Sequence, residues 1–268
     1  MTHPGELRCR FRSGAQPQLT AGLAPGWQQA NVAIVPMRYA DDFEAFLRAN
    51  PEACPPLARG HPGDPFLPCL GAGIDLRCDL PKYRVLRYGH IVAEPTQIAR
   101  FWRNDLVPFA IGCSLSFDTA LKAEGVDLRS QAAGASCAAF YSTLPAVARG
   151  PFATTLVLTM RAVPRRDLAR VIAVTSRYPQ AHGAPIHIGA PEDIGVDLGK
   201  PIDGIGLTDI RSDEVAAFWA CGVTMERAIT HAALDLAITH APGHMLITDL
   251  PVRAEPWPAG KENQQCPD

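Results

Sequence analysis

Two short loops carry the histidines best suited to chemistry in this chain. His240 and His244 flank a Pro-Gly turn between two apolar runs that favour β-strands, and His182 and His187 stand five positions apart around a glycine and a proline. Imidazole titrates near neutral pH, so such groups at strand ends suit general acid–base catalysis. This chemistry requires the two loops to meet in the fold.

A metal site is the alternative use of the same side chains. The four histidines together with Asp249 would supply nitrogen and oxygen ligands for a divalent ion. The spacing across the Pro-Gly turn differs from the helical HExxH pattern of zinc enzymes, so the sequence leaves a metal open and indicates no cofactor with certainty. A purely structural alternative for His182 or His187 is a hydrogen bond to backbone that holds the loop.

A second candidate is the segment Gly-Cys-Ser-Leu-Ser-Phe at 112–117, which joins a buried apolar run to a predicted helix. Free N–H groups at a helix start can hold a carboxylate or an oxyanion, and their dipole would lower the pKa of Cys113. Cys113 and Ser114 are therefore catalytic candidates, and Ser116 is a substrate-binding candidate. Alternatively, a serine caps the helix and Cys113 packs against the sheet. The segment lacks the G-x-S-x-G pattern of hydrolases.

Four further residues are candidates for binding a substrate. Thr224 follows Trp-Ala-Cys-Gly-Val at a second predicted helix start, although an ordinary cap is the favoured interpretation there. Arg161 and Arg177 stand at element ends, where a guanidinium can hold a carboxylate with two hydrogen bonds. Ser176 precedes Arg177 and is taken with it. Surface salt bridges are the commoner use of arginine.

Composition limits the class of protein. The chain has 268 residues, 47% of them apolar, which is enough for one large core or two that share an interface. Its 25 basic residues nearly balance 27 acidic ones without a basic block, so neither a nucleic acid nor a membrane surface is expected as partner. Eight cysteines lack zinc-ligand spacing, and no apolar run has secretory or membrane-spanning length. We expect a cytoplasmic protein with reduced thiols.

The elements that must position these residues alternate along the chain. Strands are predicted at 30–35, 106–112, 138–142, 154–161, 216–220, 237–239 and 245–248, a hairpin at 83–92, and helices at 39–50, 95–102, 116–124, 165–177 and 224–233. Residues 1–26 are expected to form an arm, the proline-rich stretch 51–81 a loop that is functional or covers a site, and residues 251–268 a disordered tail. This order predicts an α/β protein with helices covering a sheet.

Several unusual segments identify a resemblance over nearly the whole chain apart from the tail. They include Thr20-Ala-Gly-Leu-Ala-Pro-Gly26, His182-Gly-Ala-Pro-Ile-His-Ile-Gly189, Trp219-Ala-Cys-Gly-Val-Thr224 and the run 238–250. With these, the chain closely resembles the hydro-lyase family related to D-glutamate cyclase. The resemblance implies a three-layer mixed sheet with helices on both faces plus a smaller α+β two-layer domain. We assign 27–130 and 190–250 to the larger domain and 131–189 to the smaller.

The resemblance also implies a reaction, in which D-glutamate or a similar amino or hydroxy acid loses water to give 5-oxo-D-proline. The two histidine loops would supply the base and the acid, in an order left open, and the amides near Cys113 would hold the oxyanion. Arg177 or the helix start at Thr224 would hold the α-carboxylate. The alternatives are a metal-assisted hydro-lyase or amidohydrolase on another small carboxylate, and a non-catalytic small-acid binding protein. Assembly into a homo-oligomer stays open.

Overall fold

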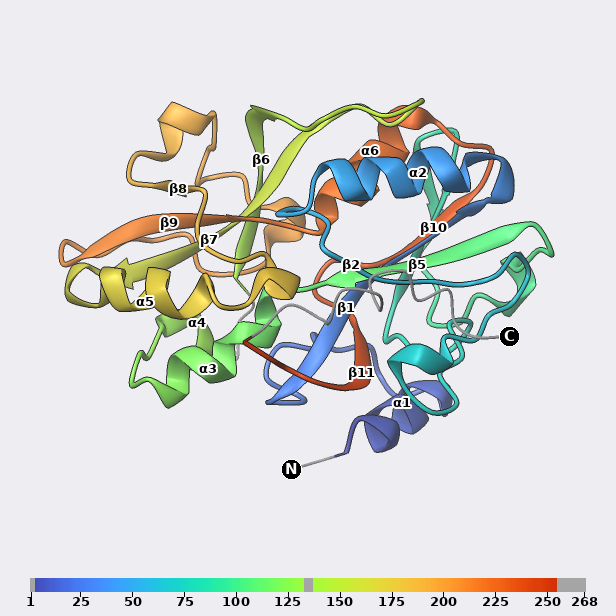
Figure 1. The fold of residues 1–268 in the computed structure, drawn as a ribbon, viewed down its shortest axis with the longest axis horizontal. Coiled ribbons are helices and arrows are strands. Elements are labelled where there is room, and N and C mark those ends of the chain that lie inside the picture. Colours follow the sequence, from blue (N-terminus) through green and yellow to red (C-terminus); the bar gives the residue numbers. More distant parts are fainter. Residues whose placement is uncertain (1–2, 133–136, 255–268) are drawn as a thin grey trace.

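Two antiparallel sheets carry the fold (Figure 1). The structure is a computed structural model that describes residues 3–132 and 137–254. The larger sheet runs in the order β2 (Pro56–Arg59), β5 (Leu106–Gly112), β1 (Trp27–Pro36), β10 (Ala237–His240), β3 (Tyr83–Arg87) and β4 (His90–Ala93), and β11 (Leu246–Pro251) also pairs with β1. The smaller runs in the order β6 (Ala138–Pro145), β7 (Thr155–Pro164), β9 (Glu214–Ala220) and β8 (His187–Ile188). All of these pairings are antiparallel.

The helices of the described residues are short. The α-helices are α1 (Pro4–Arg12), α2 (Met37–Ala49), α3 (Asp118–Ala123), α4 (Arg129–Ala132), α5 (Leu168–Thr175) and α6 (Val223–Ala232). The 3-10 helices are η1 (Pro68–Leu70), η2 (Ala99–Phe101), η3 (Ser114–Phe117), η4 (Arg165–Asp167), η5 (Pro179–Ala181), η6 (Pro191–Ile194) and η7 (Ile202–Gly204). Within this part of the chain, no helix has the length and apolar character needed to cross a membrane.

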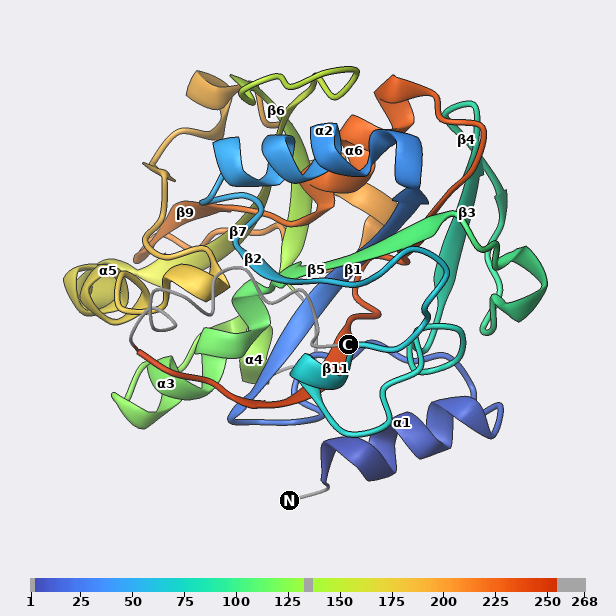
Figure 2. The same cartoon turned by 45° about the vertical axis from the view of Figure 1, so that its right-hand side comes forward.

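Helices α2 and α6 cover one face of the larger sheet (Figures 1 and 2). Their apolar stripes include Phe43 and Phe46 from α2 and Ile229 from α6, all buried in one cluster with Phe109 of β5. The rings of Phe43 and Phe109 meet edge to face with centroids 5.1 Å apart. The spacing of the apolar residues at three and four positions along α2 places them on this single face.

The opposite face of the larger sheet is covered mainly by the irregular segment 61–82. Leu67, Leu76 and Leu80 from this segment are buried against Val32 and Ile34 of β1. Helix α1 packs against β11, and the buried Arg8 donates from Nη1 to the Ile247 carbonyl at 2.8 Å. The larger sheet therefore forms the middle layer between helices on one face and loop plus α1 on the other.

Helices α3 and α5 cover one face of the smaller sheet. Leu121 of α3 and Val171 of α5 are buried with Val163 of β7 and Trp219 of β9. Loop residues from the region 190–210 cover the other face. Because side chains alternate along a strand, Thr159 and Arg161 share the face of β7 that is directed toward the larger sheet and α3.

The predicted α/β class is confirmed, and several local predictions are corrected. The expected helix at 95–102 is only the turn η2, because the Ile98 N–H donates to the distant Arg77 carbonyl instead of one four residues back. The arm 1–26 contains α1. Strand β9 joins the smaller sheet although its residues fall in the range 190–250 assigned to the larger domain. The division into two domains otherwise stays a prediction.

The predicted tail 251–268 begins inside the folded body. Pro251 ends β11, and the Val252 N–H donates to the Gly26 carbonyl. Residues 255–268 lie outside the described part of the chain.

Candidate active site

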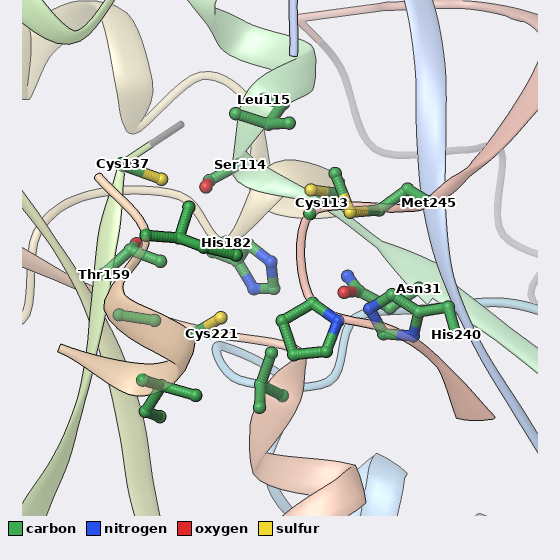
Figure 3. Close-up of a pocket in the computed structure, with 16 residues that line it drawn as sticks. Asn31, Cys113, Ser114, Leu115, Cys137, Thr159, His182, Cys221, His240 and Met245 are labelled. Atoms are coloured by element: carbon green, nitrogen blue, oxygen red, sulfur yellow. The ribbon is translucent and has the colours of Figure 1, made fainter. Parts of the chain in front are cut away.

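A small cavity of about 50 Å³ lies where the two sheets meet (Figure 3). The larger sheet contributes side chains from β1 and β10, and the smaller sheet contributes others from β7. Further walls come from the loop after β5, the loop after α5, η7, the start of α6 and the loop between β10 and β11. The polar and titratable groups that line it include Asn31, Cys113, Ser114, Thr159, His182 and His240.

The position of His240 follows from a change of partner along β1. Strand β10 pairs with the middle of β1 at Ala33, whereas β11 pairs with its beginning at Ala30. The Pro-Gly loop between β10 and β11 spans the gap. His240 ends β10 at this gap, so its ring lies in the cavity rather than in the continuous sheet.

The ring of His240 can present either a proton donor or an acceptor to the cavity. Its Nδ1 lies 3.3 Å from both the N–H and the carbonyl oxygen of Val32, whereas its Nε2 is buried and has no partner among the described residues. If Nδ1 donates to the carbonyl, Nε2 is an acceptor; if Nδ1 accepts from the N–H, Nε2 is a donor. Burial lowers the pKa of His240 to about 4, so the ring is neutral at pH 7.

His182 presents an acceptor to the same cavity. Its Nδ1 lies 2.8 Å from the Glu52 carbonyl, which can only accept, so Nδ1 carries the proton and Nε2 holds a lone pair. The residue is 2% exposed and has a left-handed backbone with φ +74°. Burial, aided by the positive charge of Arg161, lowers the pKa of His182 to about 4.

A glycine allows the His182 loop to reach the cavity. A Cβ at position 112 would lie 1.5 Å from the Gln180 carbonyl oxygen, so only glycine fits there. The carbonyl of Gly112 accepts a hydrogen bond from Asn31 Nδ2. On the other side, Trp219 Nε1 donates to the Gly183 carbonyl at 3.1 Å. The loop is thus packed against β5 of the larger sheet and hydrogen-bonded to β9 of the smaller one.

Cys113 lies in the cavity but not as the activated thiol that the sequence predicted. Burial raises its pKa well above the usual range, so the thiol stays protonated. The element that follows is a short 3-10 turn, and it has no capping side chain. Its dipole therefore does not offset burial, and the expected lowering of the Cys113 pKa is wrong.

A buried arginine stands behind Ser114. Arg161 is 1% exposed, and its guanidinium lies over the rings of Phe117 and Trp219 at 4.7 and 5.2 Å. Its Nη2 contacts Asp118 Oδ1 at 3.1 Å and Ser114 Oγ at 3.4 Å, whereas Nε and Nη1 have no partner among the described residues. Arg161 is therefore a buried positive charge whose hydrogen-bonding capacity is only partly used.

Two of the four predicted catalytic histidines are not among the cavity-lining residues. His187 starts β8, where its Nε2 lies 2.9 Å from the Ala190 carbonyl and its ring packs beside Phe218. His244 is half-buried, with Nδ1 2.8 Å from the Pro242 carbonyl. Both histidine loops line the cavity, and of the four histidines His182 and His240 are the two that do so.

Four predicted binding residues have structural partners instead. Ser176 and Arg177 are exposed, and Arg177 pairs with Glu124 at 3.2 Å, which is the surface salt bridge considered as its alternative. Ser116 Oγ accepts from the Gln29 N–H at 3.0 Å. Thr224 Oγ1 accepts from the β7 backbone at 2.9 Å, and the cap of α6 is a glycine, so the expectation that Thr224 caps this helix is wrong.

The predicted metal ligands do not come together. Asp249 pairs with Arg8 at 2.8 Å and accepts from the Ala72 N–H, at the α1 side of the larger sheet. Within residues 3–132 and 137–254, no three His, Cys, Asp or Glu side chains are arranged to hold a metal ion.

Sequence reasoning missed Asn31 and Thr159, and a signal for both was present. Each is a polar residue between two apolar neighbours in a strand, and each is buried, with 3% and 5% exposure. A buried polar side chain in a strand interior requires a partner or a function. Thr159 Oγ1 has no partner in the described chain, and Asn31 holds the Gly112 carbonyl.

Comparison with known proteins gives the family. The family model described as D-glutamate cyclase matches residues 107–249. The chain belongs to the D-glutamate cyclase family. A relative from Afipia carboxidovorans is 45% identical over 92% of this chain and 92% of its own; one from Rhodopseudomonas palustris is 44% identical over 93% and 90%; and one from Bordetella petrii is 46% identical over 91% and 92%. All three carry the name "putative hydro-lyase".

The match to the D-glutamate cyclase family includes most of the cavity. Cys113, Ser114, Thr159, His182 and His240 all lie within the matched residues. Asn31 lies outside that range but within a strand that pairs with two strands inside it. Among solved structures, a nitrogen repressor-like protein from Methanococcus jannaschii aligns over 88% of this chain and 91% of its own, with a TM-score of 0.38 and 11% identity, which is too distant to support an argument.

Proposed function

We propose that this member of the D-glutamate cyclase family is a hydro-lyase that cyclises D-glutamate, or a similar small amino acid, to 5-oxo-D-proline and water. One observation carries the proposal. Two buried, neutral imidazoles from different elements line the same cavity, each anchored to backbone through Nδ1. His240 Nε2 has no partner among the described residues, and the tautomer of His182 leaves a lone pair on its Nε2, so both nitrogens can serve a substrate.

The reaction needs both a proton acceptor and a proton donor. The α-ammonium must lose a proton before its nitrogen can attack the γ-carboxyl carbon, and the departing oxygen must gain protons to leave as water. Over the whole reaction, two protons leave the nitrogen and two reach that oxygen. His182 Nε2, which holds a lone pair, suits the first task. The protons that His182 takes from the nitrogen are those that it delivers to the departing oxygen, and His240, whose Nε2 can carry a proton, donates a hydrogen bond to that oxygen as it leaves.

The arginine behind the cavity supports a carboxylate substrate. Attack on the γ-carboxyl group places negative charge on its oxygens in the tetrahedral intermediate. Arg161 is a fixed positive charge in contact with Ser114, which lines the cavity. In a buried site such a charge acts at short range without competition from water. We assign Arg161 and Ser114 to stabilisation of the substrate anion.

The test is proton NMR of the purified protein with D-glutamate, L-glutamate or 5-oxo-D-proline, each with and without a divalent metal. We expect 5-oxoproline to form from the D-isomer in preference to the L-isomer. The matched variants are His240→Asn and His244→Asn, because both histidines belong to one loop and only His240 lines the cavity. The first is expected to lose turnover and the second to keep it.

Three results would contradict this proposal. Wild-type protein that binds D-glutamate without turnover under any condition would favour a small-acid binding protein. Equal turnover by the His240→Asn variant and the wild type would show that the reaction does not take place in this cavity. Turnover that appears only with added metal would favour the metal-assisted alternative.

A further inference from the structure

The glycine-rich arm Thr20–Gly26 bridges the cavity loop and helix α3. Its first residue donates from N–H to the Gly243 carbonyl at 2.8 Å, and the Thr20 Oγ1 accepts from the Met245 N–H at 3.2 Å. At its other end, the Gly26 N–H donates to Thr119 Oγ1 at 3.2 Å. The arm is thus held in place by polar contacts to two separate elements, and it forms one wall of a surface pocket.

This arm pocket, defined by the arm together with β1, α3 and α4, has a volume of about 550 Å³. That is about eleven times the volume of the cavity between the sheets. Half of the residues that line it carry polar side chains. A second groove near the cavity, the proline groove, is lined by five prolines together with residues that include His182 and Ala184. The polar groups of the arm pocket include Gln29, Asp118, Thr119, Lys122, Ser130 and Gln131.

Two amide oxygens at the arm pocket lack hydrogen-bond donors. Gln29 is 3% exposed; its Nε2 donates to the Thr20 carbonyl at 2.9 Å and its Oε1 has no partner in the described residues. Gln131 Nε2 faces the Asp118 carbonyl at 3.4 Å, and its Oε1 likewise has no partner. Exchanging the nitrogen and oxygen of either amide would place its Oε1 against a backbone carbonyl oxygen. The assignment therefore holds, and the two unpaired Oε1 atoms are acceptors. A buried acceptor without a donor favours a ligand that brings N–H groups.

The charges of the arm pocket complement a zwitterion. Asp118 is partly buried and pairs with Arg161 through Oδ1 at 3.1 Å, and its second oxygen, Oδ2, adds a further acceptor at the pocket. Lys122 is exposed at the rim and forms no ion pair with a described residue. A ligand with an ammonium near the acceptors and a carboxylate near Lys122 would satisfy both sides.

The arm pocket adjoins the cavity at one side chain. Leu115 lines both, and Figure 3 shows it beside Ser114 at one end of the cavity. Leu115 packs only in an apolar cluster with Cys113 and Met245, so a rotamer change breaks no hydrogen bond of its side chain. The proline groove adjoins the cavity at His182, which is held by its bond to the Glu52 carbonyl. A path past Leu115 would therefore break no side-chain hydrogen bond, whereas a path past His182 would break one.

We propose that the arm pocket is a capture site for a free α-amino acid, which then passes Leu115 into the cavity. The passage step rests on the proposed function, whereas binding at the arm pocket does not. Asp118 and the amide oxygens of Gln29 and Gln131 take the ammonium, and Lys122 takes a carboxylate. In this proposal the arm forms the wall of the pocket beside these groups.

Binding is tested by NMR titration of ¹⁵N-labelled protein, using the His240→Asn variant so that the ligand is not consumed. The ligands are D-glutamate, glutarate, which lacks the ammonium, and 4-aminobutyrate, which lacks the α-carboxylate. We expect D-glutamate to shift the amide signals of Thr119, Lys122 and Ser130, and each of the other two to bind at least tenfold more weakly. Lys122→Glu should abolish the shifts, and the neighbouring exposed Glu124→Gln should preserve them.

Passage is tested by kinetics in the wild-type background. Leu115→Trp should lower kcat/KM for D-glutamate at least tenfold, because a larger side chain blocks the path. Ala184→Trp, which fills the proline groove, should leave kcat/KM within a factor of two. Circular dichroism would verify that both variants are folded. The reverse pattern would place the route at His182 and overturn the passage step.

The two proposals fail in different ways. Shifts at the arm pocket without turnover by the wild type would preserve the capture site and remove the cyclase function. Turnover without shifts, or shifts unchanged by Lys122→Glu, would overturn the capture site and leave the cyclase function standing.

Discussion

At the scale of single residues, the backbone decides what each imidazole can do. His182 is restricted to one tautomer by a carbonyl, whereas His240 faces both a donor and an acceptor of one peptide strand. The sequence indicated both residues as catalytic candidates. It could not separate them from His187 and His244, because the direction of a ring depends on where β10 leaves β1 and on a loop that crosses Gly112.

The bond between His182 and the Glu52 carbonyl gives a prediction that separates structure from catalysis. The amide Nδ2 of asparagine can occupy the place of Nδ1, so His182→Asn should unfold within a few degrees of the wild type while its kcat falls by about 10²–10⁴. His182→Leu leaves the carbonyl without its donor and should lower stability further, by about 1–3 kcal/mol. Thermal melts and NMR rates measure the two effects. Equal melting of both variants would show that this hydrogen bond does not stabilise the loop.

The lowered pKa values predict a loss of stability in mild acid. Between pH 6.5 and about 4, the unfolded chain protonates both histidines while the folded chain keeps His182 and His240 neutral. Stability therefore falls as pH drops through this window, by about 2 kcal/mol per histidine from pH 7 to pH 5. Urea unfolding at the two pH values measures it. The His240→Asn variant should show a smaller difference than the wild type, and an equal difference would refute burial of that imidazole.

At the scale of elements, the approach of the His182 loop to β5 depends on one missing side chain. Gly112→Ala would place a methyl group against the Gln180 carbonyl, so the loop must move away. We expect Gly112→Ala to lower stability by about 3 kcal/mol and to lower activity as well. Gly125→Ala is the control: Gly125 has a positive φ, so alanine is strained there, but the site is open space and activity should fall less. Denaturant unfolding and turnover test this. A fully active Gly112→Ala variant would contradict the role of the loop.

Local pattern predicted most strands and the helices that have amphipathic stripes. The helix α2 is an example, since Phe43, Phe46 and Leu47 repeat on one face in sequence and in structure. The predicted helix 95–102 was wrong because the Ile98 amide bonds to the distant Arg77 carbonyl, which no local pattern records. The helix α1 was missed because its stabilising contact is a buried arginine to β11, 239 residues away in sequence.

At the scale of the whole molecule, one ion pair ties the two sheets at the site. Asp118 follows the turn after β5 of the larger sheet, and Arg161 belongs to β7 of the smaller. Asp118→Asn would leave the buried guanidinium without its carboxylate, and we expect a loss of about 3 kcal/mol. The exposed pair at Arg177 is the control, because Arg177→Gln should cost less than about 1 kcal/mol. Equal effects in thermal unfolding would contradict this linking role.

The way in which the two sheets meet could not be predicted from the sequence, because it depends on strand pairings between distant segments. The class of fold and the presence of a second sheet follow from alternation and resemblance. The assignment of β9 to the smaller sheet does not, because β9 pairs with β7 about 55 residues earlier in the chain. The cavity forms where these long-range pairings meet. Sequence could therefore indicate single lining residues but not which of them lie together.

The central claim is that His182 and His240 act on one substrate in one cavity. The most direct measurement is the rate of 5-oxoproline formation from D-glutamate, by NMR, for the wild type, His182→Asn, His240→Asn and the double variant. Groups that serve one reaction are not additive, so the double variant should lose little more than the worse single variant. Wild-type rates in either single variant, or losses that simply multiply in the double variant, would contradict a shared site.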